Sequence, residues 1–184
     1  GGVPTTTQYN IPQPPDVVTV TKYQQFTQYT SAVYATYGSG GETTSDPRLR
    51  RCAWACAQVS YSAEGRPTLL AAAWAPLHGR QTVPRAEISA ILYVLRHAPT
   101  GSITTITDCQ PIYKKWYNNT RTLDGSPMET DWHEFWQLID ARPGTTLIWT
   151  PSHPTLAEAA NYSPERRRLH LANHFADVLT TAAA

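Results

Sequence analysis

Three acidic side chains stand out because they lie at the end of a predicted strand or inside a predicted helix. Asp108 follows the apolar run ITTIT, Glu87 lies near the start of QTVPRAEISA, and Asp177 lies in NHFADVL. Strand ends in a mixed sheet are where ligand sites collect, so these carboxylates indicate a site. Each also has a plainer interpretation: Glu87 could favour a helix N-terminus, Asp108 could cap a helix, and Asp177 could be a solvated helix residue.

A fourth position is singled out by the stretch SAVYATYGSGGETTSD, residues 31–46. It predicts a strand that runs into a glycine-rich turn, and such a turn often delivers a side chain to a catalytic centre. The residue in the delivering position is Tyr37. A phenol is neutral at pH 7, with an ordinary pKa of about 10, and it offers one oxygen where a carboxylate offers two and a full charge.

The elements that must position these residues follow from the hydrophobic pattern and from the Pro and Gly breaks between apolar runs. Three strands come first and pair as a meander, and the later strands are each followed by a loop and a helix. This order predicts a mixed sheet with helices packed on it. The expected strands are 32–36, 50–63, 67–79, 103–107 and 145–153, and the expected helices are 82–98, 110–119, 129–142 and 165–184.

Residues 1–30 differ in composition from the rest of the chain, being rich in Pro, Gln, Thr and Tyr with few aliphatic residues. They predict an extended arm ahead of one domain at residues 31–184, with DVVTVTKY as a short strand. The arm is either a free tail or a segment that wraps its own domain or a partner.

Composition limits the classes of function. The chain has 184 residues, of which 41% are hydrophobic and 16% charged, with a formal net charge of +1. That is not the charge of a strongly basic nucleic-acid binder. Phosphate contacts would therefore depend on two local basic runs, RLRR at 48–51 and RRR at 166–168. Each run could instead be a solvated face. No apolar run approaches the roughly 20 residues of a membrane span, so no membrane insertion is expected.

The three cysteines, Cys52, Cys56 and Cys109, have a poor spacing for zinc and fit small buried apolar residues. Their number favours a reducing, intracellular compartment, with the mitochondrion and the plastid among the options.

Five motifs together resemble ribonuclease H, and in particular the ribonuclease H domains of retroelement polyproteins. The motifs YGSGG, QTVPRAEISA, ITDCQPIYKKW, LIWTPSHP and NHFAD occur in that family's order across residues 31–181. The resemblance implies an α/β, ribonuclease H-like fold. That fold has a five-stranded mixed sheet, with the first three strands antiparallel and helices on both faces.

In that family, four carboxylates hold two Mg²⁺ ions, because phosphodiester cleavage needs a generated nucleophile and a stabilised leaving oxygen. Mg²⁺ prefers oxygen ligands, which carboxylates supply. The resemblance implies that Glu87, Asp108 and Asp177 are catalytic, metal-binding residues. It also implies that His153, in TPSHP, is the mobile-loop histidine that assists proton transfer or product release.

The resemblance further implies contacts with an RNA–DNA hybrid, whose minor groove and 2′-hydroxyl groups are read by main-chain and polar groups. Gly38 and Ser39 match the turn after the first carboxylate. Thr82 matches a phosphate contact, and Gln110 matches a base or sugar contact.

The chain departs from the family pattern at the first carboxylate. The family motif opens Thr-Asp-Gly-Ser, whereas residues 36–39 read TYGS, so Tyr37 replaces the aspartate that bridges both metals. We expect metal affinity and cleavage to fall by orders of magnitude. Glu42 and Asp46, five and nine residues later, could fold back as substitutes.

A second departure is the spacing of 24 residues between His153 and Asp177, which is longer than in compact members of the family. The extra segment TLAEAANYSPERRR lengthens the loop beside the site, and long loops are often functional.

Three functions follow from these observations. The first is a degenerate, catalytically inactive domain that serves as a structural or binding subunit of a larger assembly and contacts protein partners through the 1–30 arm. The second is an active Mg²⁺-dependent endoribonuclease on RNA–DNA hybrids. The third is a module that binds hybrid or double-stranded RNA without cleaving it. Tyr37 and the near-neutral charge favour the first.

Overall fold

A six-stranded mixed sheet forms the centre of the protein, in the order β1-β4-β3-β2-β5-β6. The computed structural model describes residues 19–28, 32–40, 46, 51–122, 125–151 and 156–183. The neighbouring pairs β1–β4, β4–β3 and β3–β2 are antiparallel. β5 runs parallel to β2, and β6 runs parallel to β5. The strands are β1 (Thr21–Tyr23), β2 (Val33–Ser39), β3 (Ala53–Tyr61), β4 (Pro67–Pro76), β5 (Thr104–Thr107) and β6 (Thr146–Trp149).

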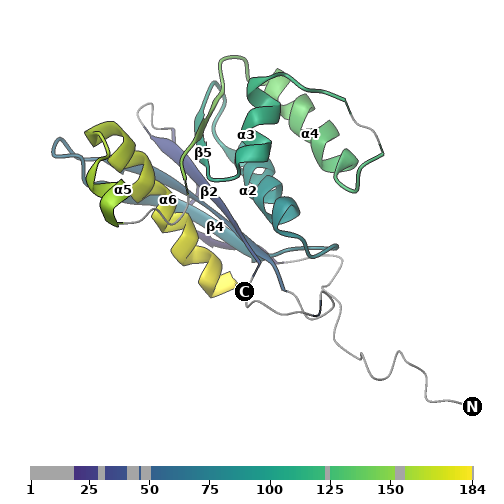
Figure 1. Ribbon diagram of the computed structural model, residues 1–184, viewed down its shortest axis with the longest axis horizontal. Coiled ribbons are helices and arrows are strands. Elements are labelled where there is room, and N and C mark those ends of the chain that lie inside the picture. The colour runs from purple at the N-terminus through teal and green to yellow at the C-terminus, as the bar shows by residue number, and fades with distance from the viewer. Residues whose placement is uncertain are drawn as a thin grey trace, which may run out of the picture.

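Helices cover both faces of this sheet, with α2, α3 and α4 on one side and α6 on the other (Figure 1). This confirms the predicted α/β, ribonuclease H-like fold. The strand count differs from the expected five because β1, from the N-terminal arm, joins the edge of the sheet beside β4. The helices are α2 (Val83–His97), α3 (Gln110–Tyr117), α4 (Glu129–Asp140), α5 (Leu156–Ala160) and α6 (Pro164–Ala183).

Small side chains bring α6 close to the middle of the sheet. Ala35, Ala55 and Ala57 are fully buried and form one cluster with Ala172 and Ala176 of α6. Alanine-on-alanine packing lets the backbones of a helix and a sheet approach closely, since little side-chain volume separates them. This packing sets the position of Asp177, one residue after Ala176.

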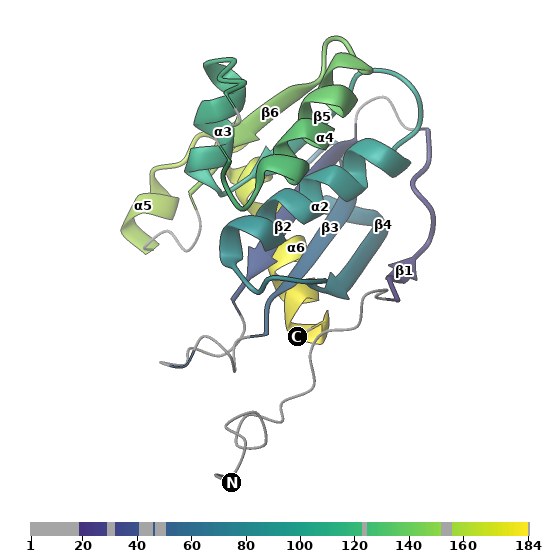
Figure 2. The ribbon, with the colours of Figure 1, turned by 90° about the vertical axis from the view of Figure 1, so that its right-hand side faces the viewer.

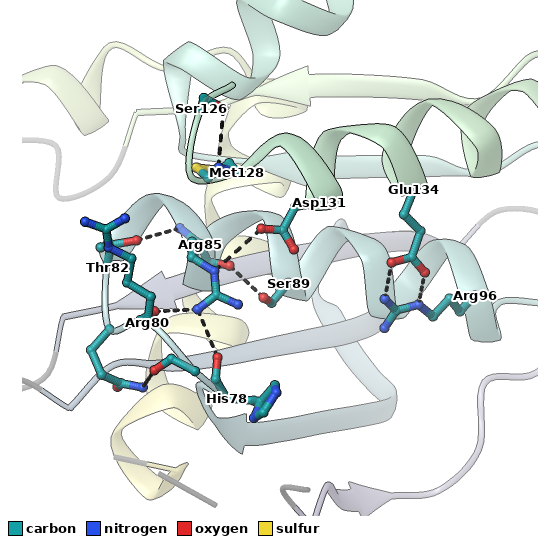
Figure 3. A network of polar contacts seen from close by, with 12 residues as sticks. His78, Arg80, Thr82, Arg85, Ser89, Arg96, Ser126, Met128, Asp131 and Glu134 are labelled. Atoms are coloured by element: carbon teal, nitrogen blue, oxygen red, sulfur yellow. Dashed lines mark hydrogen bonds and ion pairs between the residues drawn. The ribbon is translucent and has the colours of Figure 1, made fainter. Parts of the chain in front are cut away.

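Two ion pairs join α2 to α4 on the opposite face (Figure 3). Arg85 Nε lies 3.5 Å from Asp131 Oδ2, and Arg96 donates two hydrogen bonds to the Glu134 carboxylate. Beside these pairs, the apolar residues of α2 form a core with Trp132, Phe135 and Trp136 of α4. The orientation of α2, and therefore of Glu87, is thus fixed by contacts on both sides.

The described part of the arm, residues 19–28, lies along the edge of the sheet (Figure 2). β1 pairs with β4, and the Phe26 ring contacts the rings of Tyr34 and Tyr93 edge-on. Gln58, which is fully buried in β3, accepts a hydrogen bond from Thr27 N (3.0 Å) and donates one to Thr27 O (2.7 Å). A buried amide that pairs with both backbone groups of one residue holds this stretch in place.

The segment between His153 and α6 contains a short helix that the sequence pattern did not predict. α5 covers Leu156–Ala160, and a turn at 161–163 leads into α6. Its sequence LAEAA has a high helix propensity, but five residues are too few to show a helical period.

Candidate functional site

The close packing of β2 against α2 brings Tyr37 and Glu87 together. A Cβ atom on Gly38 would lie 2.4 Å from Glu87 N and 2.8 Å from the Ala86 carbonyl carbon. These contacts are too short for any side chain, so only glycine permits this approach. Gly38 therefore has a structural role whether or not a substrate contacts it.

Glu87 is a buried carboxyl group that shares a hydrogen bond with Asp108. Its side chain is 5% exposed, and burial raises its pKa well above the ordinary value of 4.5. The charge of Asp108 and a hydrogen bond with Asp108 raise the pKa further, while a hydrogen bond from the Gly38 backbone opposes the shift. Glu87 thus tends to keep its proton and donate it to Asp108.

Tyr37 lies close to all three acids of the cluster. Burial raises the pKa of its phenol above the usual value of 10, as do the neighbouring carboxyl groups of Asp177, Asp108 and Glu87. A hydrogen bond with Asp177 acts in the same direction, because the neutral phenol donates its proton to the carboxylate. Tyr37 is therefore a neutral hydrogen-bond donor within the cluster of carboxyl groups.

The structure brings together Glu87, Asp108 and Asp177 around Tyr37, as the sequence pattern predicted. Two of the plainer interpretations do not hold, because Glu87 is buried in the second turn of α2 and the N-cap of α3 is Cys109 rather than Asp108. Asp177 is half-buried rather than fully solvated. The catalytic and metal-binding roles of these residues stay predictions.

The predicted substrate contacts lie around this cluster. Thr82 is the N-cap of α2, and its hydroxyl oxygen accepts a hydrogen bond from Arg85 N at 3.4 Å. Ser39 ends β2, and Gln110 is exposed at the first position of α3.

Two predicted residues, His153 and Glu42, lie outside the described residues. Asp46 is described, but the charges that raise the pKa of Tyr37 come from Asp177, Asp108 and Glu87, and Asp46 is not one of them.

Two positioning residues were missed by sequence reasoning. The Thr36 hydroxyl donates a hydrogen bond to Ile106 O (2.8 Å), which ties β2 to β5 just below the site. Trp149 Nε1 donates one to Asp108 O (3.1 Å), which holds the residue after β5. Neither contact has a sequence signal, because each depends on which strands are neighbours.

Within the described ranges, no group of three or more His, Cys, Asp or Glu side chains is arranged to hold a metal ion. The arrangement consists instead of two hydrogen-bonded pairs, Glu87 with Asp108 and Tyr37 with Asp177.

Comparisons with solved structures show the ribonuclease H fold. Neither the family models nor the curated proteins that were searched match this chain. The crystal structure of the prototype foamy virus protease–reverse transcriptase matches 87% of this chain at 22% identity, with a TM-score of 0.62. This chain spans 21% of that longer protein.

Two separate ribonuclease H structures match over nearly their whole length. The solution structure of the prototype foamy virus ribonuclease H domain has a TM-score of 0.57 at 18% identity, covering 88% of this chain and 98% of that one. RNase H1 from the archaeon Halobacterium salinarum has a TM-score of 0.55 at 19% identity, covering 83% and 96%. At these identities, the likeness shows that the fold is that of ribonuclease H domains.

No helix in the described parts of the chain has the length and apolar character that crossing a membrane requires.

Proposed function

We propose that this chain is a degenerate ribonuclease H-like domain that does not cleave nucleic acid and acts as a binding or structural module of a larger assembly. The observation that carries the proposal is the place of Tyr37. A neutral phenol that donates to Asp177 stands where the two-metal mechanism needs a bridging carboxylate.

The raised pKa values of Glu87 and Tyr37 also support this proposal. Glu87 and Tyr37 both hold a proton more firmly than usual, and each shares it with a neighbouring aspartate. A metal ion would have to displace these protons, and the missing fourth carboxylate lowers the charge available to offset that cost. The donor set therefore does not fit a pair of Mg²⁺ ions.

Binding of nucleic acid is supported by the structural neighbours. The foamy viral protease–reverse transcriptase has been solved in complex with an RNA/DNA hybrid and with double-stranded DNA, and the hybrid complex matches 91% of this chain at a TM-score of 0.58. We propose that this chain also binds a nucleic-acid duplex, but does not cleave it.

A protein partner at the arm is supported by the edge of the sheet. All three residues of β1 are exposed, and β1 is an edge strand, so its outer backbone groups are available for strand addition. Copurification from native material, followed by limited proteolysis, would test this: a bound partner should protect residues 1–30, and free digestion of the arm within the native assembly would contradict it.

A cleavage assay tests the catalytic part of the proposal. The purified chain is incubated with a labelled RNA–DNA hybrid and Mg²⁺ or Mn²⁺, beside the Asp108→Asn variant. We expect no turnover above that of the variant. Turnover that disappears in Asp108→Asn would overturn the proposal in favour of an active endoribonuclease. Glu87, Asp108 and Asp177 would then be its catalytic carboxylates.

A further inference from the structure

Four arginines gather at the end of the sheet that lies away from the carboxylates. Arg66 belongs to the turn between β3 and β4, and residues 166–168 lie in the first turns of α6. All four side chains are exposed. Asp177 lies nine residues beyond Arg168, which is about 14 Å along the helix axis at 1.5 Å per residue. We call these four residues, Arg66, Arg166, Arg167 and Arg168, the arginine patch.

The β3–β4 turn and α6 are joined directly, so the patch is one surface. The Tyr61 hydroxyl donates a hydrogen bond of 2.6 Å to Arg168 O. A Cβ atom on Gly65 would lie 3.0 Å from Arg168 Nε, so this guanidinium packs against the turn that carries Arg66. Residues about 100 positions apart in sequence therefore present their charges side by side.

The guanidinium groups of the patch are not engaged by the carboxylates of the described residues. None of them forms an ion pair with another described residue. Three other arginines do form such pairs: Arg85 with Asp131, Arg96 with Glu134, and Arg121 with Asp140.

Aromatic rings hold two of the patch arginines instead. Arg166 lies 4.9 Å from the centre of the Tyr162 ring, and Arg168 lies 6.0 Å from that of Tyr61. Stacking on a ring orients a guanidinium while its N–H groups remain available in the plane.

Three of the patch arginines lie at the N-terminal end of α6, where the helix dipole disfavours positive charge. The N-terminus of a helix carries partial positive charge, so cations there are unfavourable for the isolated fold. Two acids, Glu64 and Glu165, lie nearby, so four arginines against two glutamates leave a local charge of +2 in a chain whose total is +1. The rest of the chain therefore carries −1 in sum, so the surface around the patch is more positive than the chain as a whole. The other basic run, RLRR at 48–51, lies mostly outside the described residues.

We propose that the arginine patch binds the backbone phosphates of a nucleic-acid duplex. Guanidinium groups match phosphate oxygens with two parallel hydrogen bonds, and a surface of several arginines fits a row of phosphates. This deepens the proposed function, because it gives the non-cleaving module a binding surface on the α6 side of the sheet, apart from the carboxylates.

The test compares two triple variants that lose the same charge. Fluorescence anisotropy with a labelled 18-base-pair RNA–DNA hybrid is measured over a range of salt concentrations. The patch variant is Arg66→Gln, Arg166→Gln and Arg167→Gln, which spares the packed Arg168. The control changes three exposed cations elsewhere: Lys22→Gln, Arg80→Gln and Lys114→Gln.

We expect the patch variant to lose roughly tenfold or more in affinity and the control to lose much less. Each lost phosphate contact should reduce the slope of log affinity against log salt by about 0.9, so the patch slope should fall by about 2 to 3. Equal losses in the two variants, or unchanged binding by the patch variant, would overturn the inference. If the triple variant fails to fold, the single charge reversal Arg167→Glu replaces it.

This outcome is separate from that of the proposed function. Cleavage of the same hybrid by the unmodified chain would overturn the proposed function and leave the patch standing. Normal binding by the patch variant would overturn only the patch.

Discussion

At the residue scale, the site holds two shared protons, because burial and neighbouring carboxyl groups favour the neutral forms of Glu87 and Tyr37. Glu87 shares one with Asp108, and Tyr37 shares the other with Asp177. The proton on Glu87 reduces the local negative charge, and the Tyr37 phenol donates a hydrogen bond to Asp177, so the three carboxyl groups repel one another less. The neutral phenol of Tyr37 thus affects both the charge and the hydrogen bonding of the cluster.

The raised pKa of Glu87 makes a prediction about stability and pH. A carboxyl group whose folded-state pKa is raised stabilises the fold most below its unfolded pKa of about 4.3, and that contribution is lost as the pH rises through the folded-state value. Glu87→Gln, which cannot ionise, should therefore match the unmodified chain near pH 4 and exceed its melting temperature increasingly toward pH 8.

Thermal melts from pH 4 to pH 8 measure this difference. Glu64→Gln, at an exposed turn position, is the matched control and should show no such trend. A Glu87→Gln melting temperature that falls below that of the unmodified chain as the pH rises would contradict the assignment of a proton to Glu87.

The carboxylates of the site could be predicted from sequence because each lies in or next to a strand or helix that the hydrophobic pattern predicts. Asp108 follows a strand, and Glu87 and Asp177 interrupt apolar helical patterns. The sharing of protons could not be predicted, because it depends on burial and on distances between residues that are far apart in the chain. The same holds for the Thr36 hydroxyl and its bond to Ile106 O.

At the scale of elements, the described part of the arm acts as an additional edge of the domain. β1 has only three residues, so its pairing alone contributes little, and Phe26 and the Gln58 amide provide the other contacts. Sequence composition predicted an extended segment here. The run DVVTVTKY also predicted a short strand, and β1 lies at its end. The sequence could not predict that this strand joins the sheet, because its partner is β4, about 50 residues away.

Truncation of Phe26 should loosen this arm. Phe26→Ala removes a half-buried ring from Tyr34 and Tyr93, and we expect the free energy of unfolding to fall by about 1–2 kcal/mol. Tyr23→Ala is the control, since Tyr23 is 48% exposed on β1 and should cost little.

Denaturant unfolding, together with the rate of proteolysis within residues 19–28, measures the effect of both variants. Equal behaviour of the two would show that the contact of Phe26 with the sheet does not hold the arm.

At the scale of the whole molecule, the carboxylates and the arginine patch occupy opposite ends of one sheet. Tyr37 and Asp108 lie where β2 and β5 end, whereas the β3–β4 turn and the start of α6 carry the arginines. The order of strands and helices made this fold predictable from sequence. The patch was visible only as the run RRR, because Arg66 joins it through the packing of the β3–β4 turn on α6.

The central claim is that Tyr37 prevents metal binding at this site, and calorimetric titration with Mg²⁺ and Mn²⁺ tests it most directly. Three proteins are compared: the unmodified chain, Tyr37→Asp, and Tyr37→Phe, which removes the hydroxyl without adding a carboxylate. We predict saturable binding for Tyr37→Asp alone, because only that variant supplies a fourth carboxylate that can bridge two metal ions. Binding by the unmodified chain as tight as that of Tyr37→Asp would contradict the claim.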